Sequence, residues 1–368
     1  MADRRVYDLK TGYPDLSLVP RERLSQFAQA ILMQGTGLQY AGDAAGTAHA
    51  RAQIAQFLTG IYHLAVDPSQ IIVTTGALQS IDITCRALTA PGDVVIVESP
   101  TFYYAVTVIQ ACRVEIVGVP MGSEGIDLNA LETIVRQYGG RVKVVYTIPV
   151  FHNPTGICAS VANRRGLIAL AARYGFTVLE DATYQPLYFG EPPPPLIQSF
   201  DEGGHVVTVA SFSKLVMPGL RVGWVLAAPE NIRTIKTAKG DGGASMFTTE
   251  IVASYLESGE FADQVEFARR FYAKKHDLMV AALDRYAPQS LNWNAPGGGY
   301  FVWGELAAGL SVEKLYTLAQ ARGVDFFPGS ASFADGNDDS HLRLCFAYLP
   351  DSDIEPAVKL LCECLREL

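Results

Sequence analysis

The chain has 368 residues, of which 49% are hydrophobic, and its formal net charge is −9. A chain of this length buries a large core and suggests one large and one smaller domain. The acidic balance argues against nucleic acid or an anionic membrane as the main partner, because both attract basic patches.

The six cysteines form no CxxC pair, and no His-rich stretch accompanies them. This pattern predicts free, mostly buried thiols in a reducing compartment rather than disulfides or a metal site. The first residues, MADRRVYDLKTGYPD, lack the apolar core of a signal peptide, and no apolar run approaches the length of a membrane span. We therefore expect a cytoplasmic protein of enzyme size.

From about residue 66, short apolar runs alternate with amphipathic segments. The amphipathic segments, such as residues 128–138 and 162–174, predict helices. Apolar strands without alternation, separated by helices, indicate an α/β fold with a parallel-type sheet that is covered on both faces. The expected strands are residues 71–74, 94–98, 113–119, 142–147, 176–180, 206–210 and 222–227.

Clusters of polar and glycine residues follow several of these expected strands. In a parallel sheet of this kind, ligands bind in the loops beyond the carboxyl ends of the strands. The clusters therefore predict a binding site at that edge of the sheet. They read TTGALQ, ESPTFYY, IPVFHNPTG, EDATY and SFSK.

From about residue 260 the pattern changes. A long, charged helical stretch over residues 260–286 precedes strand signals at residues 299–304 and 342–347. This order is typical of a smaller α+β domain. The expected division is a small domain of residues 1–35 and 260–368 and a large domain of residues 36–259.

The stretch SFSKLVMPGLRVGW, residues 211–224, places a lysine and an arginine in an otherwise apolar segment. Burial at a strand end disfavours the charged form of Lys214 and lowers its pKa, and the neutral amine is the form that reacts with carbonyl groups. Ser211, Ser213 and Arg221 would then supply hydroxyls and a fixed cation for a phosphate. On this segment alone, a lysine that snorkels from a strand end is the more common arrangement.

Three further segments bear on the same site. TTGALQS, residues 74–80, joins a strand end to a helix start, where exposed amides either suit a phosphate or form an ordinary turn. Asp181 in EDATY ends an apolar strand, and a buried acid there needs a cation, such as a protonated pyridine nitrogen. HNPTG, residues 152–156, is typical of a turn, and His152 is either a turn residue or a substrate-facing group.

Taken together, these segments resemble pyridoxal-phosphate enzymes of fold type I, and among them the class I/II aminotransferases, including the aminoadipate and kynurenine aminotransferase-like group. The resemblance covers nearly the whole chain, and the matching pieces fall in the family's order. They are TGYPD (11–15), YAGDAAGTAHARAQIAQFL (40–58), TTGALQS (74–80), ESPTFY (98–103), NPTG (153–156), EDATY (180–184), SFSKLVMPGLRVGW (211–224), PGGGYFVW (296–303), PGSASF (328–333) and HLRLCFA (341–347). The resemblance implies a large domain with a mixed, mostly parallel sheet and a small α+β domain built from both chain ends. It also implies pyridoxal 5′-phosphate as cofactor.

The resemblance also implies a role for individual residues. Lys214 would bind the cofactor covalently and move a proton, and Asp181 would pair with the pyridine nitrogen. Asn153 and Tyr184 match the pair that hydrogen-bonds the phenolic oxygen O3′. Phe102 occupies the position of the aromatic ring that stacks on the cofactor. The phosphate would lie in a cup made of the amides of Gly76, Ala77 and Leu78 together with Ser211, Ser213 and Arg221.

Two further residues concern the substrate and the partner subunit. Arg343 matches the arginine that binds the substrate α-carboxylate, helped by Gly12 and Asn153. Tyr40 matches a tyrosine that reaches the phosphate from the neighbouring subunit, so a homodimer with shared active sites is implied. Leu78 stands where many relatives carry a polar phosphate ligand, so only its amide can contribute.

Each of these assignments has a simpler structural alternative. Phe102 and Tyr103 could be plain core aromatics. Arg343, in a strand-like context, could pair with a structural acid. The glycines at residues 297–299 could only turn the chain within the small domain.

The resemblance implies an aminotransferase that moves an amino group between an L-amino acid and a 2-oxo acid. The same residues would also serve a lyase that eliminates a β- or γ-substituent, or a cyclase that closes a ring in an arginine-like amino acid. A regulatory domain that only senses the cofactor is disfavoured, because the chain is acidic and shows no basic helix-turn-helix. Relatives usually carry a further N-terminal segment over the substrate pocket, whereas this sequence begins close to TGYPD, so the substrate stays open.

Overall fold

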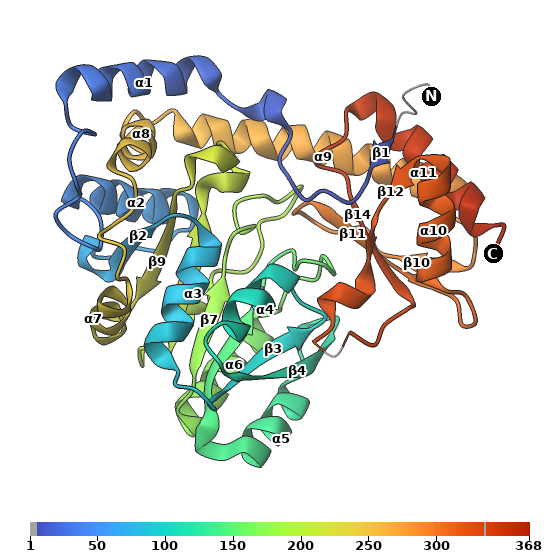
Figure 1. The fold of residues 1–368 in the computed structure, drawn as a ribbon, viewed down its shortest axis with the longest axis horizontal. Coiled ribbons are helices and arrows are strands. Elements are labelled where there is room, and N and C mark those ends of the chain that lie inside the picture. Colours follow the sequence, from blue (N-terminus) through green and yellow to red (C-terminus); the bar gives the residue numbers. More distant parts are fainter. Residues whose placement is uncertain (1–5, 335) are drawn as a thin grey trace.

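The computed structural model describes residues 6–334 and 336–368, and its centre is an eight-stranded sheet in the order β2-β9-β8-β7-β6-β3-β4-β5 (Figure 1). Strands β3, β4, β6, β7 and β8 run parallel, whereas β9 is antiparallel to β2 and β8, and β5 is antiparallel to β4. The expected mixed, mostly parallel sheet is therefore confirmed, and seven of its strands begin and end within three residues of the expected bounds, whereas the short strand β5 was not expected. The strands are β2 (Ile71–Thr74), β3 (Val94–Ser99), β4 (Glu115–Gly122), β5 (Gly125–Ile126), β6 (Val142–Thr147), β7 (Thr177–Asp181), β8 (Val206–Ser211) and β9 (Gly223–Ala227).

Helices cover both faces of this sheet (Figure 1). Val95 and Val97 of β3 pack with α3, α4 and α7 on one face. Val94 and Ile96 of the same strand pack with α5 and α6 on the other face. A strand that is buried on both faces explains the apolar runs without alternation. The helices of this part of the chain are α1 (Arg21–Gln34), α2 (Ala48–Ile61), α3 (Ala77–Leu88), α4 (Tyr103–Gln110), α5 (Leu128–Tyr138), α6 (Val161–Tyr174), α7 (Pro229–Ala238) and α8 (Met246–Glu257).

Local capping chemistry fixes the starts of the two helices that the amphipathic pattern indicates most clearly. The side chain of Asp127 accepts hydrogen bonds from the backbone amides of Asn129 and Ala130 at the start of α5. The side chain of Ser160 does the same for Asn163 at the start of α6. Such caps satisfy amides that have no partner within the helix, so they set where each helix begins.

The C-terminal part of the chain forms a second, four-stranded antiparallel sheet in the order β10-β11-β14-β13. Near the N-terminus, β1 pairs in parallel with β12, so the two ends of the chain meet on this side of the molecule. The predicted α+β character is confirmed. The elements are β1 (Tyr7–Asp8), β10 (Leu291–Trp293), β11 (Phe301–Leu306), β12 (Val324–Asp325), β13 (Phe327–Pro328), β14 (His341–Cys345), α10 (Val312–Arg322) and α11 (Asp351–Leu365).

The long helix α9 (Phe261–Tyr286) runs from one sheet toward the other (Figure 1). Its first half, including Val265 and Tyr272, packs into the core around α2 and α8. Its second half, including Met279 and Leu283, packs into the core of the smaller sheet. One continuous helix therefore contributes to both cores, while the expected domain boundaries at residues 35 and 260 stay a prediction.

The glycines at residues 297–299 join the two parts rather than turn within one. A Cβ atom on Gly298 would lie 2.3 Å from the carbonyl oxygen of Leu187 and 2.4 Å from the ring of Phe151, so only glycine fits there. Leu187 and Phe151 belong to the core of the larger part. The alternative that these glycines only turn the small part is therefore wrong.

A buried ion pair holds the loop after β6 in place. Arg164 and Glu180 are both fully buried, and Nη1 of the arginine lies 3.8 Å from Oε1 of the carboxylate. Arg164 also donates hydrogen bonds to the carbonyl oxygens of Pro149, Ala159 and Pro195. Burial raises the pKa of Glu180, and Arg164 opposes that shift. The arginine thus links the two ends of the loop over residues 149–159, because it binds a carbonyl oxygen at each end.

All six cysteines are free thiols, as the sequence predicts. Over the described ranges, no helix combines the length and the apolar character that crossing a membrane requires. The same residues contain no group of three or more His, Cys, Asp or Glu side chains that could hold a metal ion.

Candidate active site

A cavity of about 560 Å³ lies beyond the carboxyl ends of β7 and β8 and is closed on its far side by residues of β11 and β14. Asp181 and Ser211 are the last residues of β7 and β8. The cavity therefore lies at the edge of the sheet where the sequence predicts a binding site. The lining includes these residues named from the sequence: Gly12, Ala77, Leu78, Phe102, Asn153, Asp181, Tyr184, Ser211, Ser213, Lys214, Arg221 and Arg343.

Lys214 ends the short helix η5 (Phe212–Lys214), directly after β8. Its Nζ atom donates a hydrogen bond to the carbonyl oxygen of Gly12 at 2.7 Å. Burial lowers the pKa of Lys214 to about 8, and the nearby guanidinium groups of Arg343 and Arg221 act in the same direction. Low dielectric and two fixed cations disfavour an ammonium ion, so a neutral, nucleophilic amine forms near neutral pH.

Asp181 is buried and its carboxylate is held from two sides. Thr183 donates its amide and its hydroxyl to Oδ1 at 3.0 and 2.6 Å. Tyr146 donates to Oδ2 at 3.2 Å. Burial raises the pKa of Asp181, although these hydrogen bonds and Lys214 oppose it. A cationic N–H group in the cavity would therefore be a favourable partner for this carboxylate.

The side of the cavity next to α3 has the features of a phosphate site. No side chain caps the start of α3, where Ala77 and Leu78 line the cavity. Ser211 donates through Oγ to Ser213 at 2.8 Å, and Arg221 donates to the Ser213 hydroxyl at 3.4 Å. In the part of the chain that the structure describes, no carboxylate forms an ion pair with Arg221. An uncapped helix start, two hydroxyls and an unneutralised guanidinium suit a dianion.

Gly76 lies just outside this lining and makes room for the arginine. It adopts a positive φ of 117°, and a Cβ atom there would lie 2.7 Å from Nη2 of Arg221. Arg221 itself has a positive φ of 51°, which is uncommon for a residue other than glycine. The backbone on both sides of the contact is therefore shaped to bring the guanidinium to the start of α3.

Tyr184 and Phe102 complete the walls that the sequence predicts. Tyr184 is buried, and burial raises the pKa of its phenol well above the usual value, so it stays a hydrogen-bond donor. Phe102 is the residue before α4, where it lines the cavity while it also packs against the core. It is therefore both a core aromatic and a cavity residue.

Arg343 projects from β14 and is buried. Its Nη1 atom donates to Oδ1 of Asn153 at 3.0 Å, and Nη2 donates to the carbonyl oxygen of Lys10 at 2.8 Å. The Nε atom is buried and finds no hydrogen-bond partner among the residues described. No carboxylate in the same residues forms an ion pair with it, so the alternative of a structural acid is wrong. A buried guanidinium with an unpaired donor, facing a cavity, suits a carboxylate ligand.

His152 does not face the substrate cavity. It is fully buried, with Nδ1 2.9 Å from the hydroxyl of Thr155 and Nε2 3.1 Å from Oε2 of Glu98. The latter contact is too poorly aligned to count as a hydrogen bond. Glu98 also accepts from the hydroxyl of Thr147 and the amide of Ile148. Of the two sequence alternatives, the substrate-facing one is wrong, because these groups draw the imidazole toward the end of β3.

Several cavity residues had no role assigned from the sequence. Residues 10–14, of which only Gly12 had a role from the sequence, form one wall, and Tyr103, Tyr104 and Phe327 form another. Tyr103 stacks on Phe327 with ring centroids 5.1 Å apart. TGYPD and ESPTFYY were the available signals, but these motifs do not show which rings turn toward a cavity. Tyr40 is not in the lining, and its side chain is 93% exposed.

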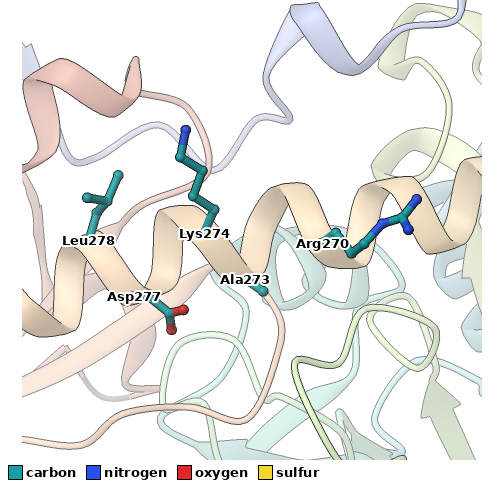
Figure 2. Close-up of a pocket in the computed structure, with 5 residues that line it drawn as sticks. All are labelled: Arg270, Ala273, Lys274, Asp277 and Leu278. Carbon is teal, nitrogen blue, oxygen red and sulfur yellow. The ribbon is translucent and has the colours of Figure 1, made fainter.

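A second hollow, of about 470 Å³, lies on the surface of α9 (Figure 2). One helix alone supplies its lining, which consists of Arg270, Ala273, Lys274, Asp277 and Leu278. Three of these side chains are exposed to solvent. Groups that converge from several elements are the mark of a binding site, so this shallow hollow is not the candidate active site.

The chain is similar to known enzymes over almost its whole length. Residues 5–361 match the family model for aminotransferase class I and II. The aromatic-amino-acid aminotransferase 1 of Thermococcus litoralis is 33% identical, and the alignment covers 98% of this chain and 88% of that protein. The 2-aminoadipate transaminase of Thermus thermophilus is 35% identical over 97% of this chain and 89% of that protein.

A solved structure agrees with these relatives. The multiple substrate aminotransferase from Thermococcus profundus has a TM-score of 0.94 and 32% identity, and the match covers 100% of this chain and 92% of that chain. The expected fold type I architecture is thereby confirmed. The relatives do not favour the lyase or cyclase alternative. The chain belongs to the class I and II aminotransferases, which makes it a pyridoxal 5′-phosphate-dependent enzyme that transfers an amino group between an amino acid and a 2-oxo acid.

Proposed function

We propose that Lys214, Asp181, Arg221 and Arg343 are the residues through which this aminotransferase works. The observation that carries the proposal is that one cavity holds all four, with a buried amine between two guanidinium groups that no described carboxylate neutralises. Such an arrangement would repel cationic ligands. It suits one molecule with a phosphate and another with a carboxylate.

The cavity fits the cofactor at three points. The start of α3, the hydroxyls of Ser211 and Ser213, and Arg221 would hold the phosphate. Asp181 would hold the pyridine nitrogen in its protonated form, since burial disfavours an unpaired carboxylate. Lys214 would supply the amine that binds the aldehyde.

The oxygen O3′ would meet two donors and the ring would meet an aromatic face. Oδ1 of Asn153 accepts from Arg343, which leaves Nδ2 of the amide as the donor. Tyr184 keeps its phenolic proton because it is buried. Phe102 would stack on the ring. Asn153 thus links the group that binds the carboxylate to the group that binds the cofactor.

When bound, the cofactor supplies an aldehyde that joins to amines and a ring that withdraws electrons from Cα of the substrate. Arg343 would hold the α-carboxylate, and the Gly12 segment would cover it. Once the incoming amine has replaced it, Lys214 would regain a neutral Nζ that can accept the proton from Cα. Its pKa of about 8 matches that task near neutral pH.

The remaining lining bears on the amino acid side chain. Besides Lys214, Arg221 and Arg343, Lys10 is the cation that lines the cavity. Its Nζ donates to the hydroxyl of Tyr316 at 2.8 Å and lies 3.7 Å from Oδ1 of Asp325. The hydrogen bond to Tyr316 raises the pKa of Lys10, and Asp325 adds to that effect. A second carboxylate on the substrate would therefore have to compete with Asp325.

Aromatic rings surround Arg343 instead. Its guanidinium lies 4.1 Å from the centroid of Phe301 and 4.4 Å from that of Phe327. Tyr103 stacks on Phe327, and Tyr104 lies beside Tyr103 with centroids 4.1 Å apart. This wall favours an aromatic or large apolar amino acid over a dicarboxylic one.

The first prediction concerns the pH dependence of cofactor capture by the apoprotein. Only the neutral amine of Lys214 reacts, so the rate of capture should rise with pH below about 8 and level off above it. The measurement is stopped-flow absorbance after mixing with pyridoxal 5′-phosphate, followed by borohydride reduction and peptide mapping. The label should fall on Lys214 and not on Lys10. A rate that keeps rising up to about pH 10, as for an unshifted lysine, would contradict the assignment.

The second prediction concerns Arg343. Replacing it with Ala should lower kcat/KM for an amino acid, and the loss of transition-state stabilisation should be about 2–5 kcal/mol, since the charged partner of the substrate carboxylate is removed. Arg343→Lys should also be impaired, because lysine lacks the planar fork. Phenylethylamine, which has no carboxylate, is the control substrate. If its reaction falls as much as that of phenylalanine, Arg343 does not bind the carboxylate.

The third prediction concerns substrate class. Phenylalanine should convert the cofactor to its amine form with a kcat/KM at least about tenfold higher than glutamate or 2-aminoadipate, which is about 1.4 kcal/mol of discrimination. The half-reaction is followed spectroscopically without a 2-oxo acid. Replacing Tyr103 with Ala should reduce this preference. A preference for the dicarboxylic substrates would refute the aromatic wall while leaving amino-group transfer intact.

The fourth prediction concerns a homodimer in which Tyr40 serves the partner's site. The support is an exposed apolar group around the end of α1, which comprises Leu32, Met33, Leu38 and Tyr40. Mixing Lys214→Ala with Tyr40→Ala protomers should restore part of the activity, because one site of a mixed dimer carries neither change.

The matched control for this mixing experiment combines two residues of the same cavity. Lys214→Ala mixed with Arg343→Ala should restore nothing, because each site of that mixed dimer carries one lesion. Equal recovery in both mixtures, or sedimentation of an active monomer, would show that the sites are not shared through Tyr40.

A further inference from the structure

Residues 10–14 form one wall of the cavity, and this segment together with Asp15 is here called the strap. Two of its carbonyl oxygens bind side chains of the cavity. Gly12 accepts from Nζ of Lys214 at 2.7 Å. Lys10 accepts from Nη2 of Arg343 at 2.8 Å. Both donors are the ones that the proposed function gives to the cofactor and to the substrate carboxylate, and the inference below rests on that function.

Under the proposed function, these two hydrogen bonds would weaken when cofactor and substrate are bound. Condensation of Nζ of Lys214 with the cofactor aldehyde would release one water and leave the nitrogen at most one hydrogen to donate. A carboxylate on Arg343 competes with the Lys10 carbonyl for the same guanidinium. The strap must then be held from elsewhere, or it would leave the cavity when it is needed to cover the substrate.

A second anchor lies at the far end of the strap. Oδ2 of Asp15 is 3.0 Å from Nζ of Lys275, and the Asp15 amide donates to the hydroxyl of Tyr272 at 3.2 Å. Lys275 and Tyr272 are both on α9 and are buried. The lysine also donates to the carbonyl oxygen of Leu349 and lies 3.3 Å from Oδ1 of Asp351. Because a buried ammonium ion needs such partners, this anchor is firmly placed.

The same turn of α9 also reaches the backbone of the reactive lysine. Tyr272 packs on Tyr300 with ring centroids 4.7 Å apart. The hydroxyl of Tyr300 donates to the carbonyl oxygen of Lys214 at 3.0 Å. Both the strap and Lys214 are therefore located relative to one helix, independently of what Nζ binds.

We propose that Asp15 and Lys275 are positioning residues that hold the strap over the cavity once Lys214 and Arg343 have taken up the cofactor and the substrate carboxylate. Neither residue touches a reacting atom. Their effect is conditional on loading. In the apoprotein, the hydrogen bonds from Lys214 and Arg343 hold the strap in place. In the loaded enzyme, the ion pair between Asp15 and Lys275 holds it instead.

The test compares Asp15→Asn with wild type in two states, the apoprotein and a loaded form, in which the cofactor has been fixed on Lys214 by borohydride and Arg343 is saturated with added 3-phenylpropionate, a carboxylate without an amino group. Hydrogen exchange is measured by mass spectrometry on a peptide that covers residues 10–15. In the apoprotein the variant should exchange at nearly the wild-type rate. In the loaded form it should exchange at least about tenfold faster than wild type.

Lys274→Met provides a matched control on the neighbouring position of α9. Lys274 projects from α9 on the side away from Asp277 in Figure 2, its side chain is 70% exposed, and its Nζ lies 2.7 Å from the other oxygen of Asp351. It has no contact with the strap carboxylate, so exchange should match wild type in both states. Asp15→Glu, which keeps the charge, should recover part of the protection. Lys275→Met should behave like Asp15→Asn. If Lys275→Met does not fold, the comparison rests on Asp15→Asn alone.

A kinetic measurement separates positioning from general destabilisation. Asp15→Asn should raise KM for phenylalanine about tenfold with a smaller change in kcat, because the strap covers bound substrate. The proposal is overturned if the loaded variant protects the strap as wild type does, or if protection is lost equally in both states. A wild-type protein that takes no reduced cofactor on Lys214 would instead refute the proposed function.

Discussion

The desolvation of a single amine is the constraint on which the rest of the site depends. Lys214 is buried between Arg343 and Arg221, so its ammonium form is disfavoured and its pKa falls to about 8. That shift requires a cavity closed by two sheets, because an exposed lysine would keep its usual pKa. Arg343 and Arg221 add to the shift, and no carboxylate among the described residues forms an ion pair with either of them. The site is therefore poised for anionic ligands before any ligand arrives.

The fold supplies this arrangement by placing separate strand ends at one edge. Asp181 and Ser211 end neighbouring parallel strands, and Lys214 follows directly. Arg343 comes from β14 in the other sheet, more than 100 residues further along the chain. Under the proposed function, the residues that would hold the cofactor belong mainly to the large sheet, and the arginine that would hold the carboxylate belongs to the small one. Asn153 connects the two parts of the cavity through its hydrogen bond to Arg343.

Helix α9 fixes the position of these two parts of the cavity relative to each other. Its first half packs into the core of the large part and its second half into the core of the small part. Midway along it, Lys275 and Tyr272 hold Asp15 of the strap, and Tyr272 packs on the tyrosine that binds the backbone of Lys214. A buried lysine in the middle of a long helix is costly unless its partners are fixed. Here those partners are the segments that surround the active site.

The sequence by itself determined seven of the eight strands of the large sheet, the long helix α9 and about half of the cavity residues, because apolar runs and strand-end motifs are local signals. It did not determine where His152 points, which rings form the wall at Tyr103 and Phe327, or that Asp15 meets Lys275. The imidazole is buried with Nε2 3.1 Å from a carboxylate oxygen of Glu98, a residue 54 positions earlier in the chain. Contacts of this kind join residues far apart in the chain, and only the packed tertiary structure brings them within a few ångströms of each other.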